Sequence, residues 1–431
     1  MLKKSIIILT LVTLFAFSAA MVSAQTIELE FWHAMSGGRT AAVEKIVDGF
    51  NAEHDDINVT AQFTGSYAET LTQGISAVRS GNPPHIIQVY EVGTQTMLDS
   101  EAIVPVYEIA EGKIDFGSVI QPILNYYSVE GNLYSMPFNS STAMLYYNKD
   151  AFAEAGIETV PETWADIEEM GLQIIDSGAA NHGLSFGWPA WILEQMHAYH
   201  NKPYANNDNG RSGRASEVYL DRDFAKMVLG TWTDLVDKDV VAYGGREYSA
   251  NQDFLAGEVA MLIQSTSSLS SIMESADFEV GTTFLPRFEG QGIGNSVIGG
   301  ASLWVMQGHS DEDYAAVVEF FKYLSKTDVT IQWHKDTGYF PSTNAAVKTL
   351  MDDRWFSDNP NYLTAFLQVL SGVQSPAANG VLLGNFVEIR DIVDTAVEEA
   401  FTGAATAEEA LDKADEQADK VLQDYTELFG N

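Results

Sequence analysis

The chain has 431 residues, no cysteine and a formal net charge of −37, with 23 Lys and Arg against 60 Asp and Glu. Such an acidic chain is a poor candidate for nucleic-acid binding, because phosphate backbones attract cationic surfaces, and we interpret the charge as a solvated acidic coat. The length favours two lobes over a single core, and the lack of cysteine excludes disulfides and a lipid anchor on cysteine.

The first 24 residues are predicted to be a signal peptide that is not part of the fold. Lys3 and Lys4 form a positive segment, residues 5–21 are apolar, and Val22-Ser23-Ala24 fits a signal peptidase site. The alternative is an uncleaved anchor, but the apolar run is short for a membrane span and no stop-transfer segment follows. We therefore expect a secreted, periplasmic protein.

Strand and helix patterns alternate in the first part of the mature chain. Residues 27–31, 57–63 and 85–90 have strand character, and residues 43–50 and 71–78 carry apolar side chains at helical spacing. Strand–helix–strand units at this spacing predict a mainly parallel sheet covered by helices.

The pattern is less regular after residue 137. Strands are predicted at 143–147, 259–263, 280–285 and 302–307, helices at 164–177 and 221–237, and a polar loop at 206–210. The chain after residue 310 is predicted to be mostly helical, and its last helix begins at a capping box of Thr406 and Glu409. We find no internal repeat.

The sequence offers little support for a nucleotide-hydrolysing enzyme or a zinc protease. It contains no P-loop and no H-E-x-x-H pattern, and its carboxylates are too numerous for counting to identify a glycosidase-like pair. His197 and His200 are three residues apart, but no third ligand is apparent, so we interpret them as helix-surface histidines. We predict no catalytic residue, no metal and no cofactor.

Two short segments fit either a structural or a ligand-binding role. Trp188 and Trp191 flank Pro189 in a turn that begins at Gly187, where they could line a ligand cleft or cap a core. Residues 138–142 form a polar cluster that favours a turn, with hydroxyls offered to a ligand as the alternative.

Arg390 is a third feature with two interpretations. On the predicted helix 386–401, Phe386, Arg390, Val393 and Val397 fall on one stripe, so the arginine lies on the apolar face. In the first interpretation, its charged end extends outward or pairs with Glu388 or Asp391. In the second, it faces a cleft and binds an anion.

Several segments together resemble a known family. They are residues 31–35 (FWHAM), 65–67 (GSY), 88–94 (QVYEVGT), 137–142 (PFNSST), 145–150 (LYYNKD), 298–308 (IGGASLWVMQG), 333–339 (WHKDTGY) and 383–385 (LGN). In this order, over nearly the whole mature chain, the set resembles the glycerol-phosphate-binding members of the extracellular solute-binding family, which also includes maltose receptors. Residues 88–94 and 299–308 are the most specific of these segments.

The resemblance implies an α/β fold of the maltose-receptor type, with two lobes around a ligand cleft. We expect residues 25–137 and about 288–340 in the N-terminal lobe, and residues 141–286 and about 341–431 in the C-terminal lobe. The implied function is the periplasmic binding component of an ABC importer, not an enzyme. The expected partners are inner-membrane permease subunits, and the protein itself is expected to be a monomer.

The same resemblance implies a ligand site, carried over position by position. Its residues are Tyr67, Glu91, Ser141, Trp188, Trp191, Ser265, Gly300, Tyr339 and Arg390. The implied ligand is sn-glycerol 3-phosphate, and by extension glycerophosphodiesters such as glycerophosphocholine. The phosphate would be bound by Arg390, the hydroxyls and the Gly300 N–H. Tyr67 and Glu91 would bind the glycerol hydroxyls. The tryptophans would contact the apolar edge of the ligand or a quaternary ammonium group.

Three points stay open from the sequence. Any hydroxyl in the run from Ser265 to Ser268 could face the ligand. The first alternative function is a carbohydrate receptor of the same fold, with Arg390 in a structural ion pair. The second is a secreted hydrolase, which the sequence disfavours because no nucleophile with its base is visible.

Overall fold

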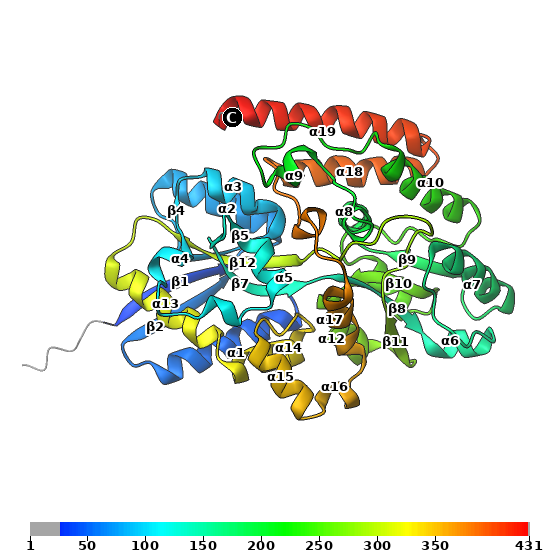
Figure 1. Ribbon diagram of the computed structural model, residues 1–431. Coiled ribbons are helices and arrows are strands. Elements are labelled where there is room, and N and C mark those ends of the chain that lie inside the picture. Colours follow the sequence, from blue (N-terminus) through cyan, green and yellow to red (C-terminus); the bar gives the residue numbers. More distant parts are fainter. Residues whose placement is uncertain (1–25, 430–431) are drawn as a thin grey trace, which may run out of the picture.

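The computed structural model describes residues 26–429 (Figure 1). The predicted signal peptide, residues 1–24, lies outside the described residues. Among the helices that are described, none is long and apolar enough to cross a membrane.

The first sheet has six strands: β1 (Ile27–His33), β2 (Ile57–Phe63), β3 (Ile86–Tyr90), β4 (Ile103–Val104), β7 (Met136–Ser141) and β12 (Gly299–Met306). Their order is β2-β1-β3-β12-β4, and β7 also pairs with β12. β1 is parallel to β2 and β3, whereas β12 is antiparallel to β3, β4 and β7. The predicted parallel arrangement is therefore right for the first three strands only. β12 comes from a distant part of the chain and runs in the opposite direction to β3.

Helices cover this sheet, as the apolar spacing of residues 43–50 and 71–78 predicts for the first two. They include α1 (Gly38–Glu53), α2 (Tyr67–Ser80), α3 (Thr94–Asp99), α13 (Asp311–Leu324) and α14 (Thr327–Thr337). α1 buries Val43, Ile46, Val47 and Phe50. α2 begins with a capping box in which Ser66 and Glu69 bond to each other's backbone N–H, and this fixes Tyr67 at the first position of the helix.

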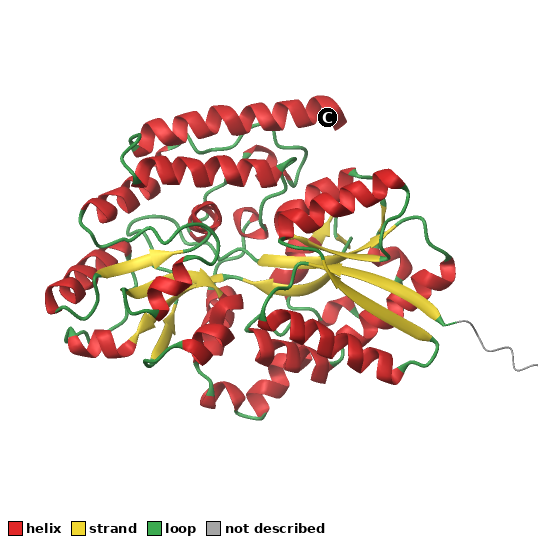
Figure 2. Ribbon diagram, turned by 180° about the vertical axis from the view of Figure 1, so that it is seen from behind, coloured by secondary structure: helices red, strands yellow, loops and turns green. Residues whose placement is uncertain are grey.

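The second sheet has four strands in the order β11-β8-β10-β9. They are β8 (Ala143–Asn148), β9 (His182–Phe186), β10 (Val259–Ser265) and β11 (Val280–Thr283). The helices around it include α7 (Trp164–Ser177), α8 (Pro189–Tyr199), α10 (Asp223–Asp237), α17 (Asn361–Ser371), α18 (Phe386–Phe401) and α19 (Ala407–Phe429). Figure 2 shows the two sheets side by side, with α18 and α19 stacked as a pair above them.

Shorter elements complete the described chain. They are the helices α4 (Val106–Ile109), α5 (Gln121–Tyr127), α6 (Lys149–Glu154), α9 (Asn206–Gly210), α11 (Ala250–Leu255), α12 (Leu269–Ser275), α15 (Asn344–Asp352) and α16 (Trp355–Asp358), and the strands β5 (Ser128–Val129) and β6 (Asn132–Leu133). In α9, residues 207–209 have left-handed φ angles, so the predicted polar loop is a tight left-handed turn.

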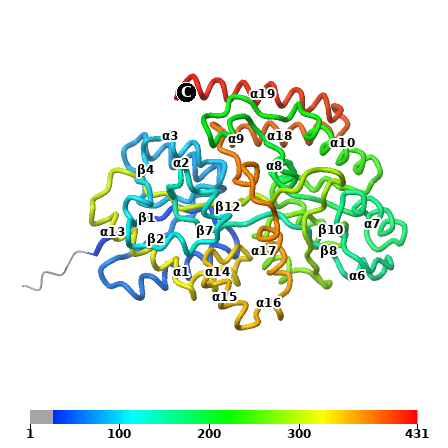
Figure 3. The backbone as a smooth tube through the Cα atoms, viewed as in Figure 1, coloured from blue at the N-terminus to red at the C-terminus, as the bar shows by residue number. Residues whose placement is uncertain are grey.

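Within residues 26–429 the chain passes between the two sheets at three places (Figure 3). Thr142 joins β7 directly to β8, and residues 284–298 join β11 to β12. After β12, the chain packs α14 against α1 and then returns to place α17 against β8 and β11. Each half of the molecule is therefore built from segments that are separated in the sequence.

Two local predictions are wrong. Residues 138–141 are not a turn, because β7 pairs with β12 and is buried along its whole length. Trp191 is not in a loop, because α8 begins at Pro189, a favoured first helical residue. Trp188 precedes that helix in a left-handed conformation with φ 56°.

His197 and His200 are buried, not on the helix surface as predicted. The Nδ1 atom of His197 lies 3.0 Å from the Pro203 carbonyl oxygen, and that of His200 lies 3.0 Å from the Gly292 carbonyl oxygen. Burial lowers the pKa of both imidazoles to about 4. These histidines therefore hold neighbouring loops against α8 as neutral side chains.

Candidate ligand-binding site

A narrow chamber lies between the two sheets. It is lined by Tyr67, Tyr90, Glu91, Ser141, Trp188, Trp191, Tyr248, Ser265, Ser267, Gly300, Tyr339 and Arg390. All nine residues that the resemblance implies are in this set. The free volume is about 30 Å³, which has room for only one or two water molecules.

Both halves of the molecule supply the walls of the chamber. Tyr67 begins α2, Glu91 follows β3, Ser141 ends β7, Gly300 is in β12 and Tyr339 follows α14. Across the chamber, Trp188 and Trp191 come from the start of α8, Ser265 from the end of β10 and Arg390 from α18. A molecule held here would touch both halves.

Three lining residues were not predicted. Tyr90 lies within the segment 88–94, and Ser267 belongs to the run of hydroxyls that the sequence left open. Tyr248 lies in an irregular stretch before α11, where the sequence carries no periodic pattern that could have pointed to it.

Gly300 sits where only glycine fits. Its φ is 95°, and an added Cβ atom would lie 1.9 Å from the carbonyl oxygen of Asn139 on β7. The register between β12 and β7 shifts next to this point, between Ala301 and Ser302. The close approach brings the Gly300 backbone and Ser141 to the same wall of the chamber.

One side of the chamber is rich in hydroxyl groups. The Tyr67 and Tyr339 hydroxyl oxygens are 3.4 Å apart, and Asn139 Nδ2 donates to Tyr67 at 2.8 Å. The Tyr248 hydroxyl lies 3.1 Å from Ser267 Oγ. Burial raises the pKa of both Tyr67 and Tyr248, so these phenols are neutral and can donate hydrogen bonds.

The other side is an ion-pair cluster around Arg390. Its Nε and one terminal nitrogen donate to the two carboxylate oxygens of Glu194 at 2.7 and 2.8 Å. The other terminal nitrogen lies 2.7 Å from Glu91 Oε1. These partners differ from Glu388 and Asp391, the two that the sequence suggested, because the cluster joins three distant segments.

The charge of this cluster matters for any ligand. Burial lowers the pKa of the Arg390 guanidinium, but Glu194 and Glu91 raise it well above its ordinary value. The side chains are 10%, 4% and 6% exposed for Arg390, Glu194 and Glu91. Burial raises the pKa of Glu194 despite the attraction of Arg390, and the contacts of Arg390 with Glu91 and Glu194 leave the cluster without a net positive charge.

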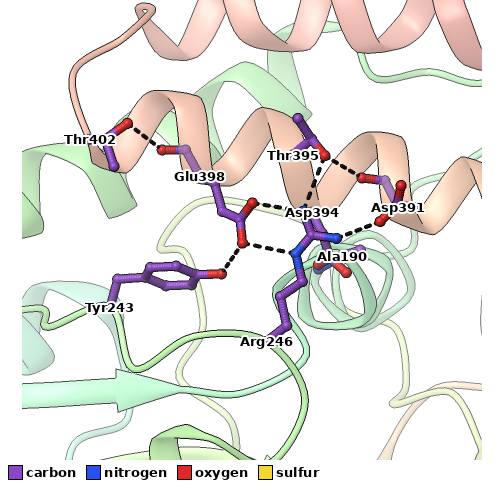
Figure 4. A network of polar contacts seen from close by, with 8 residues as sticks. All are labelled: Ala190, Tyr243, Arg246, Asp391, Asp394, Thr395, Glu398 and Thr402. Carbon is purple, nitrogen blue, oxygen red and sulfur yellow. Dashed lines mark hydrogen bonds and ion pairs between the residues drawn. The ribbon is translucent and has the colours of Figure 1, made fainter. Parts of the chain in front are cut away.

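A second network fixes α8 and α18 against each other (Figure 4). Asp394 Oδ1 accepts a hydrogen bond of 2.9 Å from the Ala190 N–H in the first turn of α8. Arg246 donates to both carboxylate oxygens of Glu398 at 2.8 and 2.7 Å, and Tyr243 donates to the same group. The network holds Arg390, Trp188 and Trp191 in place from behind.

Two wider cavities adjoin the chamber. One, of about 510 Å³, shares four aromatic residues and an arginine with the chamber: Tyr67, Tyr90, Trp188, Tyr248 and Arg390. It adds the acidic residues Glu247, Asp391 and Asp394 and the basic residue Arg246. The other, of about 200 Å³, shares Tyr67, Trp188 and Tyr248 with it and adds Arg39 and Glu247. Glu247 therefore lines both cavities, whereas Arg39 lines only the smaller one.

A group of possible metal ligands lies away from the chamber. His85, His309 and Asp313 have ligand atoms within 4.8 Å of one another. However, His85 Nδ1 accepts a hydrogen bond from the Glu30 N–H, and Asp313 caps α13 through Ser310. These side chains already have structural partners, and we assign no metal to them.

Comparison with known proteins identifies the family. A model of bacterial extracellular solute-binding proteins matches residues 45–364. The chain belongs to this family. The sn-glycerol-3-phosphate-binding periplasmic protein UgpB of Rhizobium meliloti (strain 1021) is 37% identical to it over 423 residues, 96% of this chain and 98% of the relative. UgpB of Escherichia coli (strain K12) is 37% identical over 418 residues, 94% and 95% of the two chains.

Solved structures share the fold of this solute-binding protein. UgpB from Mycobacterium tuberculosis, in complex with glycerophosphocholine, has a TM-score of 0.79 at 18% identity and covers 92% of this chain and 98% of its own. The GacH receptor of Streptomyces glaucescens has a TM-score of 0.78 at 18% identity, covering 93% and 99%. Maltose-bound MalE3 of T. maritima has a TM-score of 0.77 at 19% identity, covering 92% and 100%. The predicted fold is confirmed.

Proposed function

We propose that this solute-binding protein captures sn-glycerol 3-phosphate in the periplasm and presents it to an ABC importer. The observation that carries the proposal is the gathering of all nine residues assigned by resemblance on one chamber. Two relatives at 37% identity are periplasmic receptors named for this ligand. The protein is a periplasmic binding protein rather than an enzyme, as its family membership implies.

In this proposal the phosphoryl group lies against the hydroxyl-rich side. Ser141, Ser265 and Tyr339 would donate hydrogen bonds to its oxygens, as would the Gly300 N–H. The buried indole N–H groups of Trp188 and Trp191 have no hydrogen-bond partner within residues 26–429, so they are further donors for a ligand.

The glycerol hydroxyls would lie against the cluster of Glu91 and Arg390. Since that cluster has no net positive charge, it would attract a phosphate dianion little but accept hydrogen bonds from neutral hydroxyls. Arg390 then acts mainly by holding Glu91 and Glu194, a revision of the phosphate-binding role expected from the sequence.

Ligand entry requires the two halves to separate, since the free volume of the chamber is only about 30 Å³. We propose that each sheet is the core of one lobe, with limits near residues 25–137 and 288–340 for the first and 141–286 and 341–431 for the second. Hinge motion at the three chain passages would open and close the cleft. The closed monomer would be the form that the permease subunits recognise.

A second ligand class is glycerophosphodiesters such as glycerophosphocholine. The cavity of about 510 Å³ beside the chamber combines aromatic rings with acidic side chains, a combination that suits a quaternary ammonium group through cation–π and charge attraction. A diester headgroup would extend into this cavity while its glycerol phosphate occupies the chamber.

The carbohydrate alternative predicted an ion-paired Arg390, and Arg390 is indeed paired. One observation nevertheless favours phosphate: the opposite side of the chamber gathers hydroxyl donors.

Titration calorimetry of the mature protein from residue 25 tests the proposal. Glycerol 3-phosphate, glycerophosphocholine and maltose are titrated in turn at moderate salt. We expect one-to-one binding of a phosphate compound and no heat from maltose. Binding of maltose alone would keep the fold and move the function to sugar uptake, and turnover of any compound would support the hydrolase.

A further inference from the structure

Three arginines lie around the chamber, and two of them are neutralised. Arg390 pairs with Glu91 and Glu194. Arg246 pairs with Asp391 and Glu398. Arg39, by contrast, forms no ion pair within residues 26–429, and one of its terminal nitrogens donates a hydrogen bond of 3.0 Å to the Tyr248 hydroxyl.

Arg39 is half-buried in the first turn of α1, on the first-sheet half of the molecule. Its guanidinium carbon lies 4.8 Å from the centre of the Tyr248 ring, which belongs to the other half. A guanidinium has five N–H donors in a fixed fork, so most of its donors are available to a ligand.

Arg39 is also connected to the chamber. The cavity that it lines shares Tyr67 and Tyr248 with the chamber, and Tyr248 leads on to Ser267. Burial lowers the pKa of the Arg39 guanidinium, but interactions that include its hydrogen bond to Tyr248 keep that pKa above its ordinary value. Arg39 is therefore a charged donor beside the hydroxyl-rich side.

We propose that Arg39 is a specificity-determining residue that donates to phosphoryl oxygens and selects phosphomonoesters over diesters with cationic headgroups. This inference rests on the proposed function. Near neutral pH a monoester carries close to two negative charges, whereas a diester carries one. An unpaired guanidinium attracts the monoester more strongly and repels a headgroup cation. The contact also joins the two halves, so it favours closure on a monoester.

The experiment compares Arg39→Gln with Arg222→Gln by calorimetry on the mature protein. Arg222 is exposed and contacts its neighbour Asp221, so its variant has the same net charge with the chamber intact. We expect Arg39→Gln to weaken glycerol 3-phosphate binding about 10- to 100-fold and glycerophosphocholine binding by less than about 3-fold. Arg222→Gln should change neither, and Arg39→Lys, which keeps the charge, should fall between.

A pH profile separates this role from a purely structural one. Because a phosphomonoester gains its second charge near pH 6, the wild-type preference for glycerol 3-phosphate over glycerophosphocholine should fall as the pH drops from about 7.5 to about 5.5. In Arg39→Gln the ratio of the two affinities should not change over this pH range.

The outcomes distinguish the inference from the function. Unchanged glycerol 3-phosphate affinity in Arg39→Gln, or equal losses for both ligands, would overturn the inference while the wild-type titration still supports the receptor. A wild type that binds neither phosphate compound would overturn both. Thermal unfolding of each variant, with Arg39→Lys as the conservative substitution, shows whether any loss comes from misfolding.

Discussion

Two arginines near the chamber are in opposite states. Arg390 is bound by two buried carboxylates, Glu91 just after β3 and Glu194 on α8, while Arg39 on α1 lines the adjoining cavity and donates to a tyrosine hydroxyl. An arginine in a cleft is thus not by itself an anion site. Its role depends on how many carboxylates already contact it. A guanidinium whose N–H donors are already bound by carboxylates holds those side chains in place rather than binding a ligand.

The largest effect is expected for Arg390→Ala. The substitution leaves Glu91 and Glu194 buried without their cation, which should lower the free energy of unfolding by about 3–5 kcal/mol and abolish ligand binding. Urea unfolding of the mature protein measures this. Adding Glu194→Gln to Arg390→Ala should recover part of the loss. If the single variant loses only binding and keeps full stability, Arg390 is a ligand residue and not a scaffold.

Gly300→Ala should disrupt the backbone of the hydroxyl-rich side. An added Cβ atom meets the Asn139 carbonyl oxygen in a left-handed conformation, so we expect a loss of about 2–4 kcal/mol from strain and overlap. Gly290→Ala is the matched control. Its φ is also positive, at 73°, but nothing lies near its added Cβ atom, so its cost should stay near about 1 kcal/mol. Equal losses would mean that the close approach between β12 and β7 is unimportant.

Asp394→Asn tests the support behind the Arg390 side. Burial raises the pKa of Asp394 to about 6, against the opposing effects of the Ala190 N–H, Arg246 and Arg390. The folded state therefore holds this proton more tightly than the unfolded state, and the wild type loses stability as the pH rises from about 4 to about 6.

The Asn side chain can still accept the Ala190 hydrogen bond without being charged. We expect Asp394→Asn to be more stable than the wild type by about 1–2 kcal/mol at pH 7, with the difference vanishing below about pH 4. Thermal unfolding across pH measures it. Asp391→Asn, at a side chain that is 71% exposed, is the control. A variant that is less stable at pH 7 would contradict the raised pKa.

Tyr248→Phe should have the smallest effect. It removes the hydroxyl that contacts Arg39 and Ser267 but keeps the ring and both partners. We expect a loss of about 2- to 10-fold in affinity for glycerol 3-phosphate, equivalent to one or two ordinary hydrogen bonds. Calorimetry measures it beside Arg39→Gln. A loss larger than that of Arg39→Gln would place the phosphoryl group on the tyrosine rather than on the arginine.

The sequence predicted much of the fold through local patterns. The helix 164–177 and the apolar stripe that carries Arg390 are both present with the expected residues, because helical periodicity depends on near neighbours. The site residues came from resemblance, and the structure places them all on one chamber.

The failures involve partners far away in the chain. The turn predicted over residues 138–142 is wrong because most of these residues belong to β7, which pairs with the distant β12. Local sequence patterns do not identify Glu194 as the partner of Arg390, because the two residues are 196 positions apart. Arg39 and Tyr248 carry no local signal, since their importance depends on a contact across the cleft.

The most direct test of the account is a crystal structure of the mature protein with glycerol 3-phosphate bound. The account predicts the phosphoryl oxygens against Tyr339, Ser265 and Arg39, with the glycerol hydroxyls against Glu91. A ligand in the reverse orientation, with its phosphate on Arg390 and Glu91 displaced, would contradict it.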